Sequence, residues 1–397
     1  MIKLNKITIY TSGDFPYGGA AENFVRMMAL GLKKNDQDVD IKLFRGQNKN
    51  RVLFNNDTGI KVLTVLFKYK PSKEYLKLLE LILLILVIPF SVLADKYKRK
   101  RNTIILYGID YFYFVLPFMI FSKLCGIKLL RVVTDKYDKE TIMPVWWKRP
   151  KLYFYNIQMK YIDKHLDGIV FLSTYLYDEF IRHGGKKSRS VVIPHFIDID
   201  QFAIARRPNN AAIIIGYSGS IIRNNGIFDL LEAFRLLVDI KPNVKLMILG
   251  SANNLIAKEY DEFILKITAL KNNVIWEGQV PYNDIANKLQ QCSILINPRR
   301  KGEWADAGFP TKLGEYFSCE KIVLTTNVGD VPKYFTDGQE LFISEPNNAF
   351  SLCEKLKYIV ENIERCKIVA STGLKWANEN LHYVISSQKL IQFINFI

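Results

Sequence analysis

Residues 305–326 read ADAGFPTKLGEYFSCEKIVLTT, a turn-rich segment that leads into a short helical pattern and then into a buried strand. Thr311 stands where a helix start is expected to carry a capping hydroxyl, and Gly308 before it can bend freely. Lys312 falls in the first helical turn, where a positive charge opposes the helix dipole unless an anion is bound there. Glu315 follows within that turn, and its carboxylate can accept two hydrogen bonds from a vicinal diol such as a ribose. The stretch therefore predicts a site for the phosphate and the ribose of a nucleotide.

Strand and helix patterns alternate along the rest of the chain. In the first half, strands are expected at KITIYTS, VDIKLFR, NTIILYG and KLLRVVTD, with helical segments between them. After the polar segment ARRPNN at 205–210, the same pattern restarts with AAIIIGYSGS, VKLMILGS, SILINPRR and KIVLTT. Such alternation is typical of parallel sheets covered by helices on both faces, which bind ligands at the carboxyl ends of their strands. We therefore expect an α/β protein of two Rossmann-like, doubly wound domains, 1–204 and 205–380, with a ligand cleft between them. A C-terminal helix, 381–397, is expected to pack back on the first domain.

The composition is that of a globular protein with a large excess of positive charge. The chain has 397 residues, enough for two domains, of which 49% are hydrophobic and 24% charged. Its formal net charge of +16 indicates an acidic partner: nucleic acid, anionic lipid or a nucleotide phosphate. We expect no nucleic acid, because no recognition helix or stacking platform accompanies the charge. We also expect no metal, because neither the five cysteines nor the acids and histidines show the spacing of metal ligands.

An apolar stretch followed by basic residues occupies 76–101 of the first domain. Its uncharged part, residues 81–94, is too short to span a bilayer comfortably, and Pro89 interrupts it. One interpretation is a core helix of an α/β domain. The other is a helix that lies on a membrane, with the aromatic run at 111–121 beside it. The basic residues that would then meet anionic headgroups are Lys96, Lys98, Arg99, Lys100 and Arg101.

Two further loops follow expected strands and precede expected helices. Gly18 and Gly19, in PYGGAAEN, would let the backbone approach an anion at a helix start, although a double glycine there is also an ordinary tight turn. In YSGSIIRNNG, Arg223 has the planar fork that suits a diphosphate, although it could equally be a solvated loop arginine.

Several of these segments together resemble one enzyme family. AGFPTKLGEYFSCEKIVLTTNVGD is similar to the donor-site motif of bacterial family 4 glycosyltransferases, whose GT-B fold consists of two Rossmann-like domains. PYGGAAENFV resembles their N-terminal glycine loop, and VVIPHFIDIDQF and GYSGSIIRNNGIFDLLEAF resemble the connection and the start of their second domain. The resemblance spans almost the whole chain in the expected order, within the subgroup that reads GFPTKLGEY.

The resemblance implies a nucleotide-diphosphate-sugar donor, held mainly by the C-terminal domain, and an acceptor on the N-terminal domain. Glu315 would bind the ribose hydroxyls, and no metal would be needed because cations and helix starts stabilise the leaving diphosphate. The residues that would contact the donor, chiefly through their backbone, are Gly18, Gly19, Gly219, Ser220, Gly308, Phe309, Pro310 and Thr311.

This chain departs from the family pattern at two places. Ala307 occupies the position of the first of two paired glutamates, with Asp306 adjacent but offset. Ser220 and Asn225 occupy the positions of the usual arginine and lysine, so Arg223 and Lys312 are the cations expected to replace them.

We therefore expect a retaining glycosyltransferase of bacterial surface polysaccharide synthesis, such as capsule or lipopolysaccharide assembly. The donor would be UDP- or GDP-linked and the acceptor a polyprenyl-linked or other saccharide. The location would be cytoplasmic, peripheral on the inner face of the cytoplasmic membrane. Arg223 and Lys312 would stabilise the leaving diphosphate, and Asp135 is the best-placed candidate for a side-chain base. The alternatives are a nucleotide-sugar epimerase and a catalytically silent binding or partner subunit.

Overall fold

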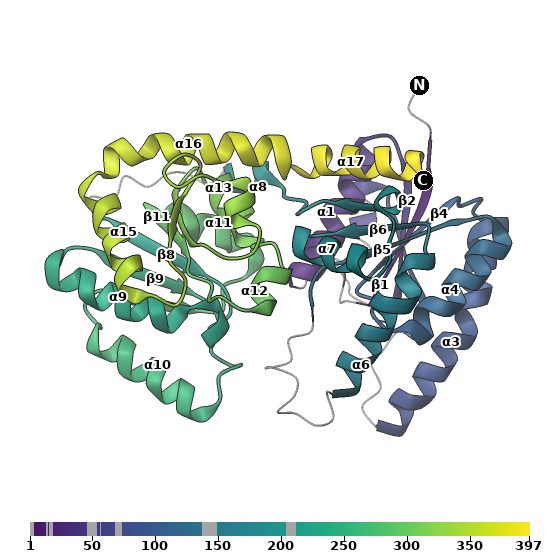
Figure 1. Ribbon diagram of the computed structural model, residues 1–397, viewed down its shortest axis with the longest axis horizontal. Helices are drawn as coiled ribbons and strands as arrows, with labels where there is room; N and C mark the ends of the chain where they lie inside the picture. Colours follow the sequence, from purple (N-terminus) through teal and green to yellow (C-terminus); the bar gives the residue numbers. More distant parts are fainter. Residues whose placement is uncertain are drawn as a thin grey trace. The chain divides into compact units, whose positions relative to one another are not determined.

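A computed structural model describes residues 4–12, 15, 19–45, 54–55, 57–67, 74–136, 149–203 and 212–397. The chain divides into two compact units: unit 1 contains Met1–Phe196 and Tyr383–Ile397, and unit 2 contains Ile197–His382. The boundary expected at 204–205 falls outside the described residues, and the structure divides the units a few residues earlier. Each unit consists of one sheet with helices on both faces (Figure 1).

Unit 1 contains a parallel sheet of seven described strands in the order β3-β2-β1-β4-β5-β6-β7. Its central strands are short and apolar because helices cover both faces, and every residue of β4 is buried. The sequence analysis did not anticipate β3. The strands are β1 Lys6–Thr11, β2 Asp38–Arg45, β3 Lys61–Phe67, β4 Thr103–Tyr107, β5 Lys128–Val133, β6 Gly168–Phe171 and β7 Ser190–Val192.

The last helix of the chain belongs to unit 1, where it lies against the first (Figure 1). Gly31 of α1 permits this contact, because a Cβ there would lie 2.2 Å from Ser387 Oγ and 2.3 Å from the Tyr383 carbonyl oxygen of α17. The helices of unit 1 are α1 Ala20–Lys34, α3 Glu74–Tyr97, α4 Phe112–Cys125, α6 Arg149–Ile157, α7 Thr174–Arg182 and α17 Tyr383–Phe396, with short helical turns at Gln158–Ile162, Asp163–His165 and Lys187–Arg189.

Helix α3, which contains the apolar stretch, is fixed to the sheet along one side. On this side of α3, the side chains of Leu84, Ile88 and Val92 are buried. Near its end, Asp95 is fully buried, pairs with Lys42 of β2 at 2.8 Å and accepts a hydrogen bond from the Tyr10 hydroxyl at 2.6 Å. The interpretation as a core helix is therefore correct for this side of α3.

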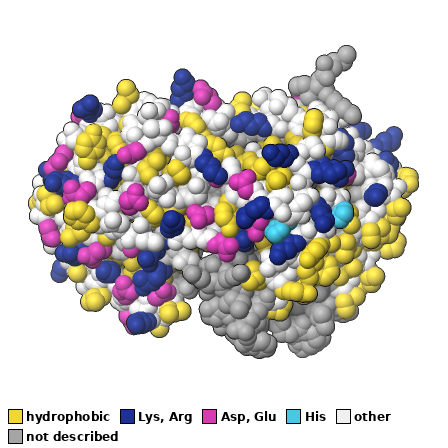
Figure 2. Space-filling view, viewed as in Figure 1, with side chains coloured by type: hydrophobic (Ala, Val, Ile, Leu, Met, Phe, Trp, Pro, Cys, Tyr) yellow, Lys and Arg dark blue, Asp and Glu magenta, His cyan; other side chains and the backbone are white. Residues whose placement is uncertain are grey.

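The opposite side of α3 remains apolar and exposed. Ile82, Leu86 and Phe90 follow one another at helical spacing with 49%, 58% and 71% of their surface exposed. Figure 2 shows apolar side chains gathered over the region of α3 and α4. Arg101 does not join the basic group beside this face, because it is buried and paired with Asp38 and Asp40. No helix in the described part of the chain combines the length and the hydropathy needed to cross a bilayer.

Unit 2 contains a second parallel sheet, in the order β10-β9-β8-β11-β12-β13. The chain adds strands in one direction from β8 to β10 and then returns to the other side of β8 with β11, which is the doubly wound arrangement expected from the sequence. The strands are β8 Ile214–Ser218, β9 Lys245–Leu249, β10 Val274–Gly278, β11 Ile294–Asn297, β12 Ile322–Thr326 and β13 Phe342–Ser344. The helices are α8 Ile199–Ala203, α9 Ile227–Ile240, α10 Ala257–Ala269, α11 Tyr282–Gln290, α12 Glu303–Ala307, α13 Lys312–Ser318, α14 Val331–Tyr334, α15 Ala349–Glu361 and α16 Ile363–Asn380.

Candidate functional site

The loops after β8 and β11 of unit 2 meet at the point where the strand order reverses. Gly226 ends the first loop with a φ of +77°, and a Cβ there would lie 1.7 Å from the Pro298 carbonyl oxygen in the second loop. The Arg300 amide donates to the Asn224 carbonyl oxygen at 3.1 Å across the same contact. Doubly wound sheets bind ligands at this reversal, outside the carboxyl ends of the strands. The loop around Arg223 that the sequence analysis singled out therefore lies at the expected edge, beside the segment that leads from β11 to α12.

Tyr316 fixes α13 to the ends of both strands. It is fully buried, and its hydroxyl accepts a hydrogen bond from the Ser218 amide at 2.9 Å. The same hydroxyl lies 3.3 Å from the carbonyl oxygens of Ser218 and Ile296, to which it can donate. One side chain thus sets the position of the GFPTKLGEY helix relative to β8 and β11, and the sequence analysis did not identify it.

Lys312 and Glu315 pair with one another. Lys312 Nζ lies 3.0 Å from Glu315 Oε2, with 30% and 11% of the two side chains exposed. The carboxylate supplies a negative charge beside the lysine, so the position of Lys312 in the first turn does not by itself require a bound anion. This weakens one argument from the sequence but leaves both predicted roles open.

The start of α13 also differs from the expectation in its capping. Thr311 has a helical backbone conformation (φ −53°, ψ −28°), and its side chain makes no capping hydrogen bond. A capping side chain needs an extended backbone at its own residue, so the predicted Thr311 cap is wrong. The first turn is tight instead, with the Leu313 and Gly314 amides donating to the Pro310 and Thr311 carbonyl oxygens.

Arg223 is held by two carboxylates of α10. Its Nε lies 3.2 Å from Glu259 Oε1 and its Nη2 lies 2.7 Å from Glu262 Oε2, while its guanidinium stacks 4.4 Å from the centre of the Phe228 ring. These hydrogen bonds raise the pKa of Arg223, with that to Glu262 the largest cause. A diphosphate would have to compete with both glutamates for this side chain.

Arg299 is a cation near these loops that the sequence analysis missed, although two consecutive arginines, one residue after the end of β11, could have signalled it. Its side chain is buried, and Nη1 donates to the Gly308 carbonyl oxygen at 3.2 Å. Its guanidinium lies over the Trp304 ring, 4.2 Å from the centre. Arg299 thus anchors the start of the GFPT loop. The next residue, Arg300, pairs with Asp229 of α9 at 3.3 Å.

The other described residues of unit 2 that were expected to contact the sugar donor lie in the loop after β8 and in the segment before α13. The Gly219 amide donates to the Leu249 carbonyl oxygen, and the Ser220 carbonyl oxygen accepts from the Tyr217 hydroxyl and the Asn225 side chain. Phe309 is buried, with its ring 6.0 Å from that of Tyr334.

Ala307, which stands where the family pattern has its first glutamate, is not accessible to solvent in this structure. Its neighbour Asp306 accepts a hydrogen bond from the Gly329 amide at 3.0 Å. Asp306 therefore already has a structural role in joining α12 to the loop after β12.

Two of the predicted residues of unit 1, Gly19 and Asp135, lie at the carboxyl edge of its own sheet. The Gly19 amide donates to Glu22 Oε2 at 2.7 Å, and Gly18 falls outside the described residues. Asp135 follows β5 and is exposed. Burial raises the pKa of the nearby Tyr107, and the charges of Asp135, Glu22 and Asp110 raise it further, so these three acids form a negative group around that phenol.

Among the described residues, no three His, Cys, Asp or Glu side chains form a group that could hold a metal ion. The expectation that the protein works without a metal stays a prediction.

The chain is similar to known proteins over both units. Residues 198–376 match the family model described as glycosyl transferases group 1. The capsular polysaccharide biosynthesis glycosyltransferase CapM of Staphylococcus aureus is 25% identical over 166 residues, which is 42% of this chain and 41% of CapM. The match thus spans about two fifths of the length of that curated relative.

Two solved structures share the fold over nearly the whole chain. Anabaena HepE in complex with UDP and glucose has a TM-score of 0.72 at 16% identity, covering 99% of this chain and 100% of HepE. A glycosyltransferase from Rickettsia africae has a TM-score of 0.74 at 16% identity, covering 99% of this chain and 98% of that one. The chain therefore has the GT-B fold of these structures, and its residues 198–376 match the family of glycosyl transferases group 1.

Proposed function

We propose that the protein is a retaining glycosyltransferase that moves a sugar from a UDP- or GDP-linked donor to a lipid-linked saccharide in bacterial surface polysaccharide synthesis. The observation that carries the proposal is the convergence of the loops after β8 and β11, held by Gly226 and Tyr316, where doubly wound sheets bind nucleotides. It is supported by two relatives: HepE was solved with UDP-glucose, and CapM is a capsular polysaccharide glycosyltransferase.

In this proposal, the bound donor replaces the Lys312–Glu315 ion pair of α13 with two new contacts, one to each side chain. A partly exposed ion pair contributes only about 0–1 kcal/mol, so a diphosphate can draw Lys312 away from Glu315. The freed carboxylate of Glu315 then accepts hydrogen bonds from the two ribose hydroxyls. One binding event thereby satisfies both side chains.

The transfer breaks the bond between the anomeric carbon and the diphosphate, and the electron pair leaves with the diphosphate. The acceptor oxygen forms its bond to the same carbon from the same face, and its proton passes to a diphosphate oxygen, with Asp135 as the alternative acceptor. Lys312 and Arg223 neutralise the charge that develops on the leaving group, which is the part that a metal plays in other transferases.

The nucleotide site is tested by thermal unfolding with UDP and GDP, followed by transfer assays over a panel of nucleotide sugars with polyprenyl-linked acceptors. At a ligand concentration of 100 Kd, binding stabilises the folded protein by about 2.7 kcal/mol. Lys312→Ala and Glu315→Ala should abolish this shift. The matched control is the exposed pair of the same spacing on α16, Glu364 and Lys367, whose alanine variants should keep it. Binding of neither nucleotide would overturn the proposal.

A catalytically silent subunit is the second candidate, because Arg223 and Lys312 both have carboxylate partners in this structure. The same assays separate the two functions. Nucleotide binding without transfer to any acceptor favours the silent subunit, whereas a product whose anomeric configuration matches the donor favours the retaining enzyme.

We further propose that the apolar side of α3 rests on the inner face of the cytoplasmic membrane. Lys98 and Lys100 are exposed where α3 ends, and an apolar face beside a basic group suits an anionic bilayer. Leu86→Glu with Phe90→Glu should abolish sedimentation with anionic vesicles. Leu265→Glu, at a 72% exposed position on α10 of unit 2, should not. Equal sedimentation of both variants would refute this docking face.

A further inference from the structure

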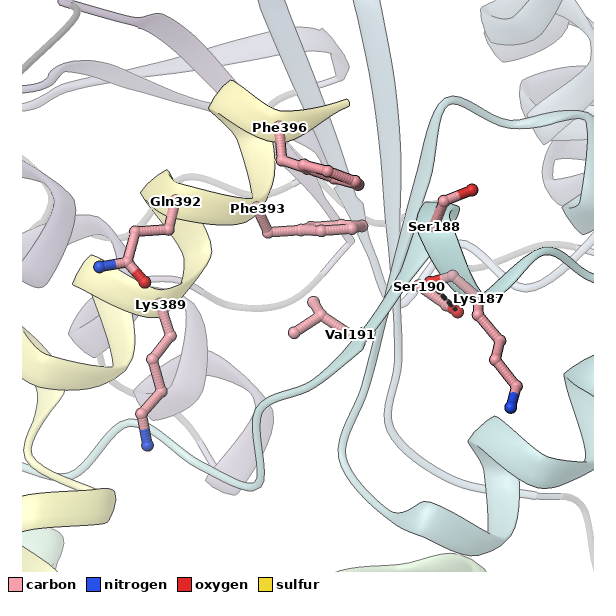
Figure 3. A pocket seen from close by; sticks show the side chains of 8 residues that line it. All are labelled: Lys187, Ser188, Ser190, Val191, Lys389, Gln392, Phe393 and Phe396. Carbon is pink, nitrogen blue, oxygen red and sulfur yellow. Dashed lines mark hydrogen bonds between the residues drawn. The ribbon is translucent and has the colours of Figure 1, made fainter.

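A groove in unit 1 has no role in the proposed transfer. It lies between α17 and the edge strand β7 with the turn before it, and it has a volume of about 380 Å³ (Figure 3). This volume is within the range of small-molecule sites. Ser190 and Val191 line one side, and Phe393 and Phe396 of α17 line the other.

Two lysines border the groove. Lys187 comes from the turn before β7 and Lys389 from α17, and Figure 3 shows them on opposite sides of Val191 with their side chains extending in the same direction. Neither forms an ion pair with any described residue. Lys389 is half-buried, and burial alone lowers its pKa. A partly buried cation without a carboxylate partner is stabilised when an anion enters beside it.

The aromatic residues provide an apolar surface next to these charges. Phe393 is only 8% exposed, whereas Phe396 is 73% exposed, and both rings extend from α17 toward the β7 side of the groove (Figure 3). An exposed ring of this kind can pack against the apolar C–H face of a sugar ring. Ser190 and Val191 complete a surface that is partly polar and partly apolar, as a saccharide is.

We propose that this groove is a second binding site, for a sugar that carries a carboxylate or a phosphate group. Lys389 contacts the anionic group, Lys187 adds positive charge on the other side of Val191, and Phe396 packs on the sugar ring. In the context of the proposed function, such a sugar belongs to an acidic acceptor chain, and the groove would hold part of that chain. The binding itself does not depend on the protein's being an active transferase.

Isothermal titration of the full-length protein with three probes tests the proposal: tetragalacturonate, glucose 6-phosphate and neutral maltotetraose. At least one acidic probe should bind at about 1 mM or below, and maltotetraose at least about tenfold more weakly. The double variant Lys187→Gln with Lys389→Gln should lose at least about tenfold in affinity for that probe, and Phe396→Ala several-fold. Lys186→Gln, at an exposed neighbour outside the groove, should change nothing, and UDP affinity should be equal in all variants.

Three results would overturn the proposal. The first is that neither acidic probe binds. The second is that the Lys187/Lys389 variant keeps full affinity, or loses no more than Lys186→Gln. The third is that inorganic phosphate or anionic vesicles compete as well as the sugars do, since the site would then recognise charge alone or a membrane. If the wild-type protein does not bind UDP, that result would count against the proposed transferase and would not count against the proposed sugar site in the groove.

Discussion

Replacing Tyr316 by phenylalanine removes one hydroxyl group and keeps the ring. The ring is fully buried, so water cannot reach the Ser218 amide that the hydroxyl accepts from at 2.9 Å. A buried donor left without a partner costs about 1–3 kcal/mol. If the free-energy cost of opening the structure around Ser218 falls by that amount, its amide should exchange with deuterium roughly five to 150 times faster, because RT is about 0.59 kcal/mol.

The assay is hydrogen–deuterium exchange of the full-length protein, read in peptides that cover the end of β8. Tyr358→Phe is the matched control, because that tyrosine is 46% exposed on α15 and its change should alter stability by less than about 0.5 kcal/mol. Tyr316→Phe should also weaken UDP binding, since α13 is then no longer fixed to β8 and β11. Unchanged exchange at Ser218 together with unchanged UDP affinity would refute the idea that this hydroxyl positions the helix.

Three further predictions concern single residues of unit 2. Gly226→Ala should destabilise the protein by more than about 1–2 kcal/mol and abolish UDP binding, because the new Cβ adds a backbone collision to the left-handed strain; Gly278→Ala, at φ +69° with open space around it, carries the strain alone, and equal melting temperatures for the two variants would contradict this. Arg299→Ala should weaken UDP binding at least about tenfold by releasing the Gly308 carbonyl, with Arg299→Lys restoring part of the affinity; full affinity in Arg299→Ala would show that the GFPT loop holds itself. Burial raises the pKa of the Cys292 thiol to about 12, so the unfolded chain loses this proton first and stability should fall as pH rises above about 8.5; Cys292→Ala should lose less stability than the wild type between about pH 7 and pH 10, and parallel losses in thermal unfolding would refute the assignment.

The alternation of strands and helices was readable in the sequence because a parallel sheet covered on both faces requires short apolar strands. The strand β3 was missed although its signal was present: KVLTVLF is a short run rich in β-branched residues, and the polar stretch KYKPSKE with Pro71 separates it from the apolar run of α3. The same run led to two opposing interpretations. The structure confirms a core helix for one side of α3, and the membrane interpretation of its exposed side stays a prediction. The sequence of α3 alone does not show which side of the helix faces the sheet. That side is set by Asp95, whose partners Lys42 and Tyr10 lie on strands far away in the sequence.

The sequence by itself determined the order of the elements, the position of the GFPTKLGEY segment after a strand, and the resemblance to the GT-B glycosyltransferases, because all three are local patterns along the chain. The Lys312–Glu315 ion pair was also within reach of the sequence, because the two residues stand three positions apart on one helix. Only the tertiary structure decided how the site is assembled. Tyr316 reaches Ser218 across 98 positions, and Arg223 meets Glu262 across 39, so no local pattern predicts either contact. Hydrogen bonds and ion pairs depend on distance in space, and folding alone brings such distant groups within 3 Å.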